Sequence, residues 1–328
     1  MEAKLKSPKV RLGKKPLVIV EGVGELNRVS KWKQVRNSWQ LYMFASLAFI
    51  SIFVFAYLPM YGVVMAFQNF RPAQGFFNSP WVGFDHFTRF FNSFHFWTLI
   101  RNTLHINIVA LVVGFPLPII LALAFNEAKD GKFKKFVQTV TYAPHFISVV
   151  VLSGMVISFT SPTTGIINHM LGLFGIEATN FLGIGQWFST VFVLSGVWQS
   201  TGWATIIYLA ALAGVDPTLH EAAIVDGASR LQRIRYINLP TIMPTVIILL
   251  IMNVGSLMSM GFERVFLLQN PLNMSHSDVI ATYVFRVGLL EGQFSFAAAV
   301  GLFNSAINAI LLVAVNYVSK KVSEVGLW

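Results

Sequence analysis

Amide, hydroxyl and indole groups lie inside otherwise apolar stretches of this chain, and they are its best candidates for binding a ligand. They are Gln199, Ser200, Trp203, Asn253, Ser256 and Ser259. Such groups suit a sugar, because sugar ring faces stack on aromatic side chains while the hydroxyls form hydrogen bonds. Asn253 and Ser256 are three residues apart and share one helix face. We interpret the set as candidates for a substrate path, with hydrogen bonding between helices as the alternative.

Catalytic chemistry finds no support in the sequence. The chain has no cysteine, which excludes thiol catalysis, thiolate metal sites and disulfides. It has no Gly-x-x-x-x-Gly-Lys-Ser/Thr to hold ATP and no Gly-x-Ser-x-Gly, and His220-Glu221 lacks the second histidine at position 224 that a zinc-protease motif needs. We therefore predict that this chain is not an enzyme and binds no cofactor or metal of its own.

The composition is that of a membrane protein. Of 328 residues, 55% are hydrophobic and only 12% are charged, and the mean hydropathy is +0.64. About 20 apolar residues span the roughly 30 Å hydrocarbon core as a helix. The chain therefore predicts an all-α, polytopic transmembrane helix bundle of about six spans. The predicted spans are residues 41–67, 98–125, 137–159, 187–213, 241–260 and 296–318.

Basic residues gather in the segments that fall on one side of a six-span topology. Ten Lys and Arg precede the first predicted span, with four, three and two more after spans two, four and six. The opposite segments hold only Arg71, Arg89, Arg264 and Arg286, with Arg101 near the mouth of span two. The positive-inside rule then predicts that both termini are cytoplasmic. Because topology accounts for the net charge of +10, we predict no nucleic-acid partner.

The loop between spans four and five, residues 216–240, carries strong local signals. Asp216 followed by a proline predicts a helix start, and Gly227 predicts its end. Ser229 and Gln232 fit a capping box, so a second helix is predicted to begin there. The pattern predicts a lever made of a short helix, a glycine hinge and a second helix that leads into span five.

This loop resembles the EAA loop of ABC importer permeases. That family's pattern is Glu-Ala-Ala, three residues, Gly, nine residues and Ile-x-Leu-Pro, and the chain matches it in type and spacing from Glu221 to Pro240. The resemblance implies a type I ABC importer permease fold and a coupling helix seated in an ATPase cleft. The ATPase-coupling residues that it implies are Glu221, Ala222, Ala223, Asp226, Gly227, Leu239 and Pro240.

Weaker motifs extend the resemblance over roughly residues 40 to 322. They include Leu58-Pro59-Met60-Tyr61-Gly62, Trp81-Val82-Gly83, Arg101-Asn102-Thr103 and Ala298-Ala299-Val300-Gly301. These are similar to permeases for complex oligosaccharides and polysaccharide fragments, the alginate importer's membrane subunits among them. The resemblance implies a bacterial cytoplasmic (inner) membrane protein that pairs with a second, different permease. It also implies two cytoplasmic ABC ATPases that bind ATP and Mg, and an extracytoplasmic solute-binding protein that delivers the saccharide.

An ion-coupled secondary carrier or channel is the alternative function. The predicted spans contain no Asp or Glu, which argues against proton coupling but leaves a sodium site of backbone carbonyls possible. His105 and His145 are interpreted as packing or interfacial residues. The aromatic residues of the loop 68–97 form either an interfacial belt or a docking surface.

The domain organisation follows from these segments. We predict a basic cytoplasmic N-terminal segment at 1–39, a first span with its aromatic extracytoplasmic loop at 40–97, and a permease core at 98–322. The core contains the coupling loop 216–240, and a short cytoplasmic tail at 323–328 follows it.

Overall fold

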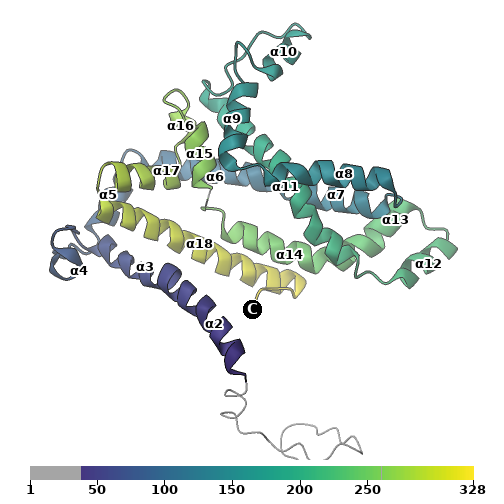
Figure 1. Ribbon diagram of the computed structural model, residues 1–328, viewed down its shortest axis with the longest axis horizontal. Coiled ribbons are helices and arrows are strands. Elements are labelled where there is room, and N and C mark those ends of the chain that lie inside the picture. The colour runs from purple at the N-terminus through teal and green to yellow at the C-terminus, as the bar shows by residue number, and fades with distance from the viewer. Residues whose placement is uncertain (1–37, 260) are drawn as a thin grey trace, which may run out of the picture. The chain divides into compact units, whose positions relative to one another are not determined.

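Figure 1 shows the computed structural model, which describes residues 38–259 and 261–328. Contacts divide the chain into two units, Met1–Tyr61 and Gly62–Trp328. The predicted basic N-terminal segment lies almost wholly outside the described residues, and so does Met260, the predicted end of span five. In the described ranges the regular elements are helices, apart from one isolated bridge between Gln68 and Trp81.

The first unit contributes one apolar helical run. Its elements are α2 (Trp39–Ile52), the π-helical turn η1 (Phe53–Tyr57) and α3 (Leu58–Met60), and the 3₁₀ turn η2 (Tyr61–Phe67) continues it. Together they make a 29-residue stretch, Trp39–Phe67, that is long and apolar enough to cross a membrane. The π turn precedes Pro59, whose missing N–H interrupts the regular hydrogen-bond ladder. The predicted first span is confirmed.

Three more helical runs of the second unit meet the length and hydropathy of a span. They are Phe96–Glu127, formed by α6 (Phe96–Gly114) and α7 (Pro116–Glu127); Arg230–Gly255; and α18 (Phe294–Ser323). They coincide with predicted spans two, five and six. The helix of the second span continues to Glu127, two residues beyond the predicted end of that span.

The third predicted span is not one straight helix. Its two parts, Lys132–Phe146 and Val149–Phe159 (α9), meet at 101°. Pro144 lies just before the bend, where it cannot donate a backbone hydrogen bond. Ser148 then caps α9 by accepting a hydrogen bond from the Val151 amide at 3.3 Å. A proline followed by a new helix cap explains why 137–159 is a bent pair.

The fourth predicted span corresponds to η4 (Gly185–Trp187) and α11 (Phe188–Leu212), which α12 (Pro217–Val225) follows at 78°. With each bent pair taken as one span, the described residues contain up to six spans. That number agrees with the prediction.

Span five begins earlier than predicted. Elements α13 (Arg230–Arg233), η5 (Ile234–Asn238) and α14 (Leu239–Gly255) form one 26-residue helix, so Pro240 does not mark the entry into a separate span. The π-helical turn η5 lies directly before Pro240, where the Leu239 amide donates to the Ile234 carbonyl and the helix continues past the proline. The second helix of the coupling loop and the span are therefore one rigid element.

Helix packing in the second unit rests on three apolar clusters. One joins α6 and α18 to the short helices α5 (Asp85–Phe91) and α17 (Ile280–Phe285), and a second joins α6, α11 and α15 (Phe262–Leu268). The third, with Ala122, Tyr208 and Ile242, ties α7, α11 and α14 together. Figure 1 shows α14 beside α18, and α7 and α8 (Lys132–Tyr142) beside α11.

Short helices occupy the segments between spans. The aromatic loop forms α4 (Gly75–Asn78) and α5, and residues 161–186 form α10 (Ile166–Gly172). After span five, α15 leads into α16 (Met274–Ser277), α17 and the π turn η6 (Arg286–Leu290). A partly buried ion pair between Asp278 and Arg286, with 2.6 Å between Oδ2 and Nη2, fixes that last segment.

Candidate functional site

Helix α12 begins and ends as its sequence predicts. The Asp216 carboxylate accepts a hydrogen bond from the Thr218 amide at 2.9 Å. This bond and a second from the Thr218 side chain lower the pKa of Asp216 below its usual value. At the other end Gly227 has φ +79°, and the Ala228 amide donates back to the Ala223 carbonyl at 2.8 Å. Only glycine adopts that conformation without strain, so Gly227 fixes where the chain turns.

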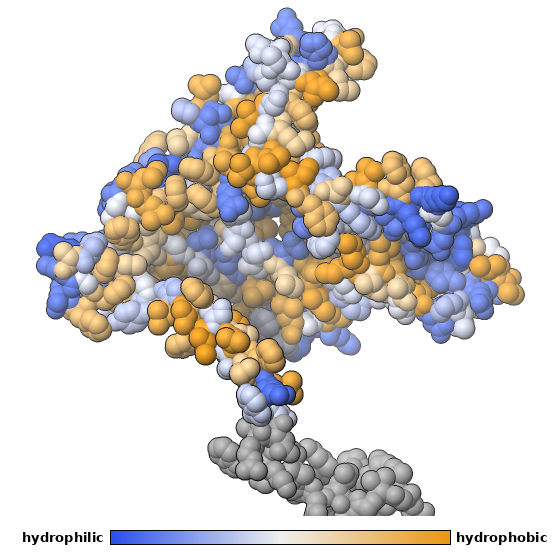
Figure 2. All heavy atoms as spheres, viewed as in Figure 1, coloured by the Kyte–Doolittle hydropathy of each residue, from blue (hydrophilic) through white to orange (hydrophobic). Residues whose placement is uncertain are grey.

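Most of the surface of α12 is exposed, and only His220 and Ala223 are half-buried. No residue in it is buried, although Leu219, Ile224 and Val225 are apolar and expose 50%, 57% and 87% of their area. Glu221 is also exposed. Figure 2 shows hydrophilic residues gathered around the end of the unit that carries α12 and α13. An exposed helix with apolar side chains in polar surroundings is typical of a docking element.

The second helix of the loop starts with the predicted capping box. The Ser229 amide donates to Gln232 Oε1 at 2.7 Å, and the Gln232 amide donates to Ser229 Oγ at 3.4 Å. This cap holds the first turn of the 26-residue helix that becomes span five.

A polar cluster fastens that helix to the end of α7. The buried Asn238 donates from Nδ2 to Glu127 Oε1 at 3.3 Å, and Arg233 Nη2 lies 3.9 Å from Glu127 Oε2. Leu239 packs beside it, in the apolar cluster that includes Ala122 of α7. The sequence analysis missed Glu127 and Asn238, because nothing in the local sequence shows that residues so far apart meet.

Four predicted path residues line one cavity of about 380 Å³ between α6, α7, α11 and α14. They are Ser200, Asn253, Ser256 and Ser259. The first three hydrogen-bond to carbonyls of their own helices, at 2.7, 2.7 and 3.1 Å, whereas Ser259 accepts from Asn308 of α18 at 2.8 Å. Ser259 thus bonds between helices, as the alternative interpretation expects. Asn107 lines the same cavity and had not been singled out from the sequence.

Gln199 and Trp203 lie elsewhere. The Gln199 amide donates to the Ile147 carbonyl at 2.8 Å, across the bend between α8 and α9, and it lines a neighbouring cavity with Arg264. Trp203 stacks on His145, with ring centroids 4.5 Å apart and planes 3° from parallel. The structure therefore brings four of the six residues together and gives Gln199 and Trp203 separate surroundings.

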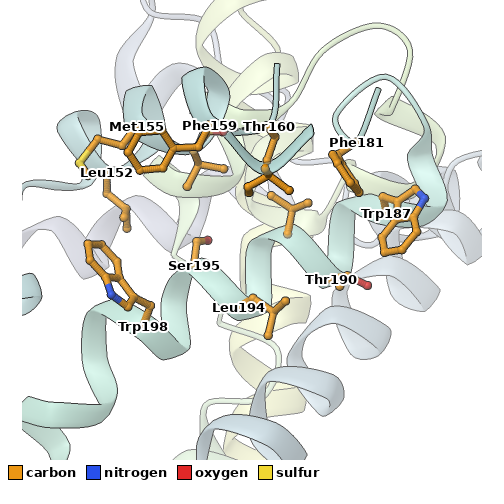
Figure 3. A pocket seen from close by; sticks show the side chains of 13 residues that line it. Leu152, Met155, Phe159, Thr160, Phe181, Trp187, Thr190, Leu194, Ser195 and Trp198 are labelled. Carbon is orange, nitrogen blue, oxygen red and sulfur yellow. Dashed lines mark hydrogen bonds between the residues drawn. The ribbon is translucent and has the colours of Figure 1, made fainter. Parts of the chain in front are cut away.

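The opposite face of α11 borders an apolar cavity of about 510 Å³. Figure 3 shows side chains of α9 and α11, among them Leu152, Leu194 and Trp198, converging on it. Few hydrogen-bonding groups line it, so it cannot satisfy the hydroxyls of a sugar. The sugar-compatible surface of α11 is the face toward α6 and α14.

Comparison with known proteins gives a consistent result. Residues 114–324 match the family described as binding-protein-dependent transport system inner membrane component. Protein LplB of Bacillus subtilis is 42% identical over 293 residues, which cover 89% of this chain and 92% of that protein. The polygalacturonan/rhamnogalacturonan transport system permease YteP of the same organism is 42% identical over 288 residues, 88% of this chain and 90% of YteP.

Two solved structures are similar over nearly the whole chain. One is a crystal structure of a bacterial ABC transporter involved in import of the acidic polysaccharide alginate, with 39% identity and a TM-score of 0.82 over 89% of this chain and 99% of that one. The other is a bacterial alginate ABC transporter in complex with a periplasmic protein bound to alginate pentasaccharide. It has 38% identity and a TM-score of 0.83, over 90% and 99% of the two chains.

Proposed function

Since this chain belongs to the binding-protein-dependent transport system inner membrane components and is a membrane permease subunit of a sugar ABC transporter, we propose that α12 couples it to cytoplasmic ATPases. The exposure of α12 is the observation that carries this proposal. ATP and Mg are held by the ATPase subunits, because this chain has no phosphate-binding loop.

The coupling path has two branches. Motion of α12 passes through Gly227 into the helix Arg230–Gly255, and the contact of Glu127 with Asn238 carries it into α7. Both helices line the cavity that holds Ser200, Asn253 and Ser256. A small movement of α12 can therefore change the width of the substrate path, as alternating access requires.

The assembly that we propose contains this chain, a second and different permease, two ABC ATPases and an extracytoplasmic solute-binding protein. Both termini and α12 face the cytoplasm, since the basic residues gather on that side. The substrate is an oligosaccharide or polysaccharide. The names of YteP and of the alginate transporters support that class, as does the polar cavity.

A charge placed on the exposed face of α12 tests the proposal. Val225→Glu should abolish copurification of the ATPases and ATP-driven uptake while leaving the permease folded, because 87% of Val225 is exposed. The matched control is Val322→Glu near the end of α18, where the valine is 80% exposed. Full assembly and uptake in the Val225→Glu variant would refute the role of α12.

A further inference from the structure

Helix α8 carries an apolar stripe that faces away from the second unit. The stripe consists of Phe133, Phe136 and Val140, which expose 80%, 66% and 53% of their area. Their spacing of three and four residues places them on one face of the helix. Val137 and Thr141, on the opposite face, are half-buried, and α8 packs on α11. The apolar stripe is therefore the outward surface of α8.

A polar stripe runs beside the apolar stripe. Lys132, Lys135 and Thr139 repeat the same spacing one residue earlier in the chain, and all three are exposed. Figure 2 shows hydrophobic residues along the outer edge of the unit over α8, next to hydrophilic residues at the end nearest α13. A helix with adjoining apolar and basic outward faces is typical of the boundary between lipid chains and lipid headgroups.

Most of the charge at the start of α8 is not neutralised by the described residues. Lys134 pairs with Asp130 at 2.9 Å, and only 18% of the Lys134 side chain is exposed. Lys129, Lys132 and Lys135 form no ion pair with a described carboxylate. Together these side chains carry four positive charges and one negative charge. The start of α8 therefore favours an anionic partner.

The lysines and the apolar stripe are arranged as the parts of a phospholipid are. The lysines lie at the start of α8, close to the end of α7 that we assign to the cytoplasmic side. The apolar stripe then extends for about 10 Å along the helix, which is within half of the roughly 30 Å hydrocarbon core. Anionic headgroups of the cytoplasmic leaflet attract basic segments next to membrane spans. One such lipid matches both the charge and the apolar stripe.

We propose that α8 binds an anionic phospholipid of the cytoplasmic leaflet, with Lys132 and Lys135 at its phosphate group and one acyl chain along the apolar stripe. The inference goes beyond the proposed function and rests on it only for the side of the membrane that α8 faces. Thr141 of α8 packs directly on Gly202 of α11, and α11 lines the polar cavity. A lipid at this site would therefore stabilise α8 against a helix of the substrate path.

Quenching of a fluorophore on α8 by labelled lipid tests this proposal. The chain has no cysteine, so Thr139→Cys provides one exposed thiol beside the apolar stripe in a whole complex whose other chains are free of cysteine. The complex is held in phosphatidylcholine nanodiscs. The probes are phosphatidylglycerol and phosphatidylcholine, each with a nitroxide near the start of one acyl chain. Phosphatidylglycerol should bind at least about tenfold more tightly, because each lysine near the headgroups contributes about fivefold.

Variants of single lysines separate this site from general attraction to the membrane. Lys132→Gln and Lys135→Gln should each lower the preference for phosphatidylglycerol severalfold, and the double variant should lose most of it. Binding of phosphatidylcholine should not change. Lys134→Gln is the matched control, because it removes the same charge from the same turn but from a side chain that already pairs with Asp130. This variant should keep the preference.

Three results would overturn the inference. They are equal quenching by the two lipids without any lysine substitution, an unchanged preference in the double variant, and no quenching by either lipid. The last result would show that a protein partner covers α8. None of these measurements involves ATP or α12, so each result leaves the proposed function intact. Conversely, full assembly and uptake in Val225→Glu would refute the role of α12 without changing the quenching on α8.

Discussion

Glu127 at the end of α7 accepts a hydrogen bond from Asn238, 111 residues later in the chain, with 3.3 Å between Oε1 and Nδ2. Arg233, on the same helix as Asn238, lies 3.9 Å from the other carboxylate oxygen. One side chain thus joins span two to the helix that leaves the coupling loop. In our account this contact lets a movement of α12 reach two spans at once.

Removal of the Glu127 carboxylate should weaken coupling. Glu127→Ala leaves the buried Asn238 amide without an acceptor, which costs about 1–3 kcal/mol. We expect more ATP to be hydrolysed per saccharide transported in proteoliposomes. In Glu127→Gln the ATP hydrolysed per saccharide should lie between the values for the wild type and for Glu127→Ala, because the glutamine amide oxygen still accepts from Asn238. Asp130→Asn is the control. It breaks the ion pair of Asp130 with Lys134 just after α7, and such an exposed pair contributes only about 0–1 kcal/mol to stability. An unchanged ratio in Glu127→Ala would exclude this contact from coupling.

Substitutions of Gly227 should act through backbone conformation alone. A Cβ at this position meets no atom within 4 Å, but φ is +79°, which costs an ordinary L residue about 1–2 kcal/mol. Transport should therefore fall in the order Gly, Asn, Ala and Val, because asparagine tolerates this conformation and a β-branched residue does not. Membrane insertion should be equal in all four. Gly172→Ala, where a Cβ also meets nothing and φ is not positive, should transport normally, and equal transport by Gly227→Val would contradict the hinge.

A second glycine should control stability and not coupling. The buried Gly202 of α11 packs so closely on the Thr141 carbonyl of α8 that a Cβ would overlap it. Gly202→Ala should lower the free energy of unfolding by about 1–3 kcal/mol, since it forces two helices apart. Gly154→Ala meets no neighbour within 4 Å and should gain up to about 1 kcal/mol of helix propensity. Thermal unfolding of both variants in detergent measures these effects. Equal melting temperatures for Gly202→Ala and Gly154→Ala would show that the contact between α8 and α11 at Gly202 does not stabilise the protein.

The cap of α12 should depend on pH. Hydrogen bonds from Thr218 lower the pKa of Asp216, so the charged form stabilises the helix start. This contribution is complete above the usual aspartate pKa of about 4 and is lost as pH falls through the lowered value. Hydrogen exchange of the Thr218 amide, corrected for its intrinsic rate, should stay slow at pH 5–7 and accelerate only below pH about 4. Asp216→Asn, which cannot titrate, should show no such acceleration; the same acceleration in that variant would rule out the carboxylate as its cause.

Local signals in the sequence predicted local structure well. Asp216, Gly227 and the Ser229–Gln232 box each act within a few residues, and all three form as expected. Apolar length also predicted six spans, the number that the described residues reach when each bent pair counts as one span. The bend after Pro144 was missed, because a proline within an apolar run is compatible with both a kinked and a broken helix.

Contacts between distant segments could not be predicted in the same way. Glu127 reaches Asn238, and Arg264 reaches Gly196, only after the helices have packed. Ser200 and Asn253 were singled out for their polarity, but hydropathy alone could not show that they line one cavity while Trp203 stacks on His145. For such residues the sequence indicates the kind of side chain, and packing decides its partner.

A crosslink from α12 to an ATPase tests the central claim most directly. The chain contains no cysteine, so Ala222→Cys introduces a single thiol on the exposed surface of α12. Val322→Cys provides a control at an exposed position on α18. Each ATPase would carry one cysteine at its surface cleft, and a homobifunctional maleimide would link the two thiols. Our account predicts an ATP-dependent crosslink from position 222 and none from position 322. Absence of a crosslink from position 222 in an assembled, transporting complex would contradict it.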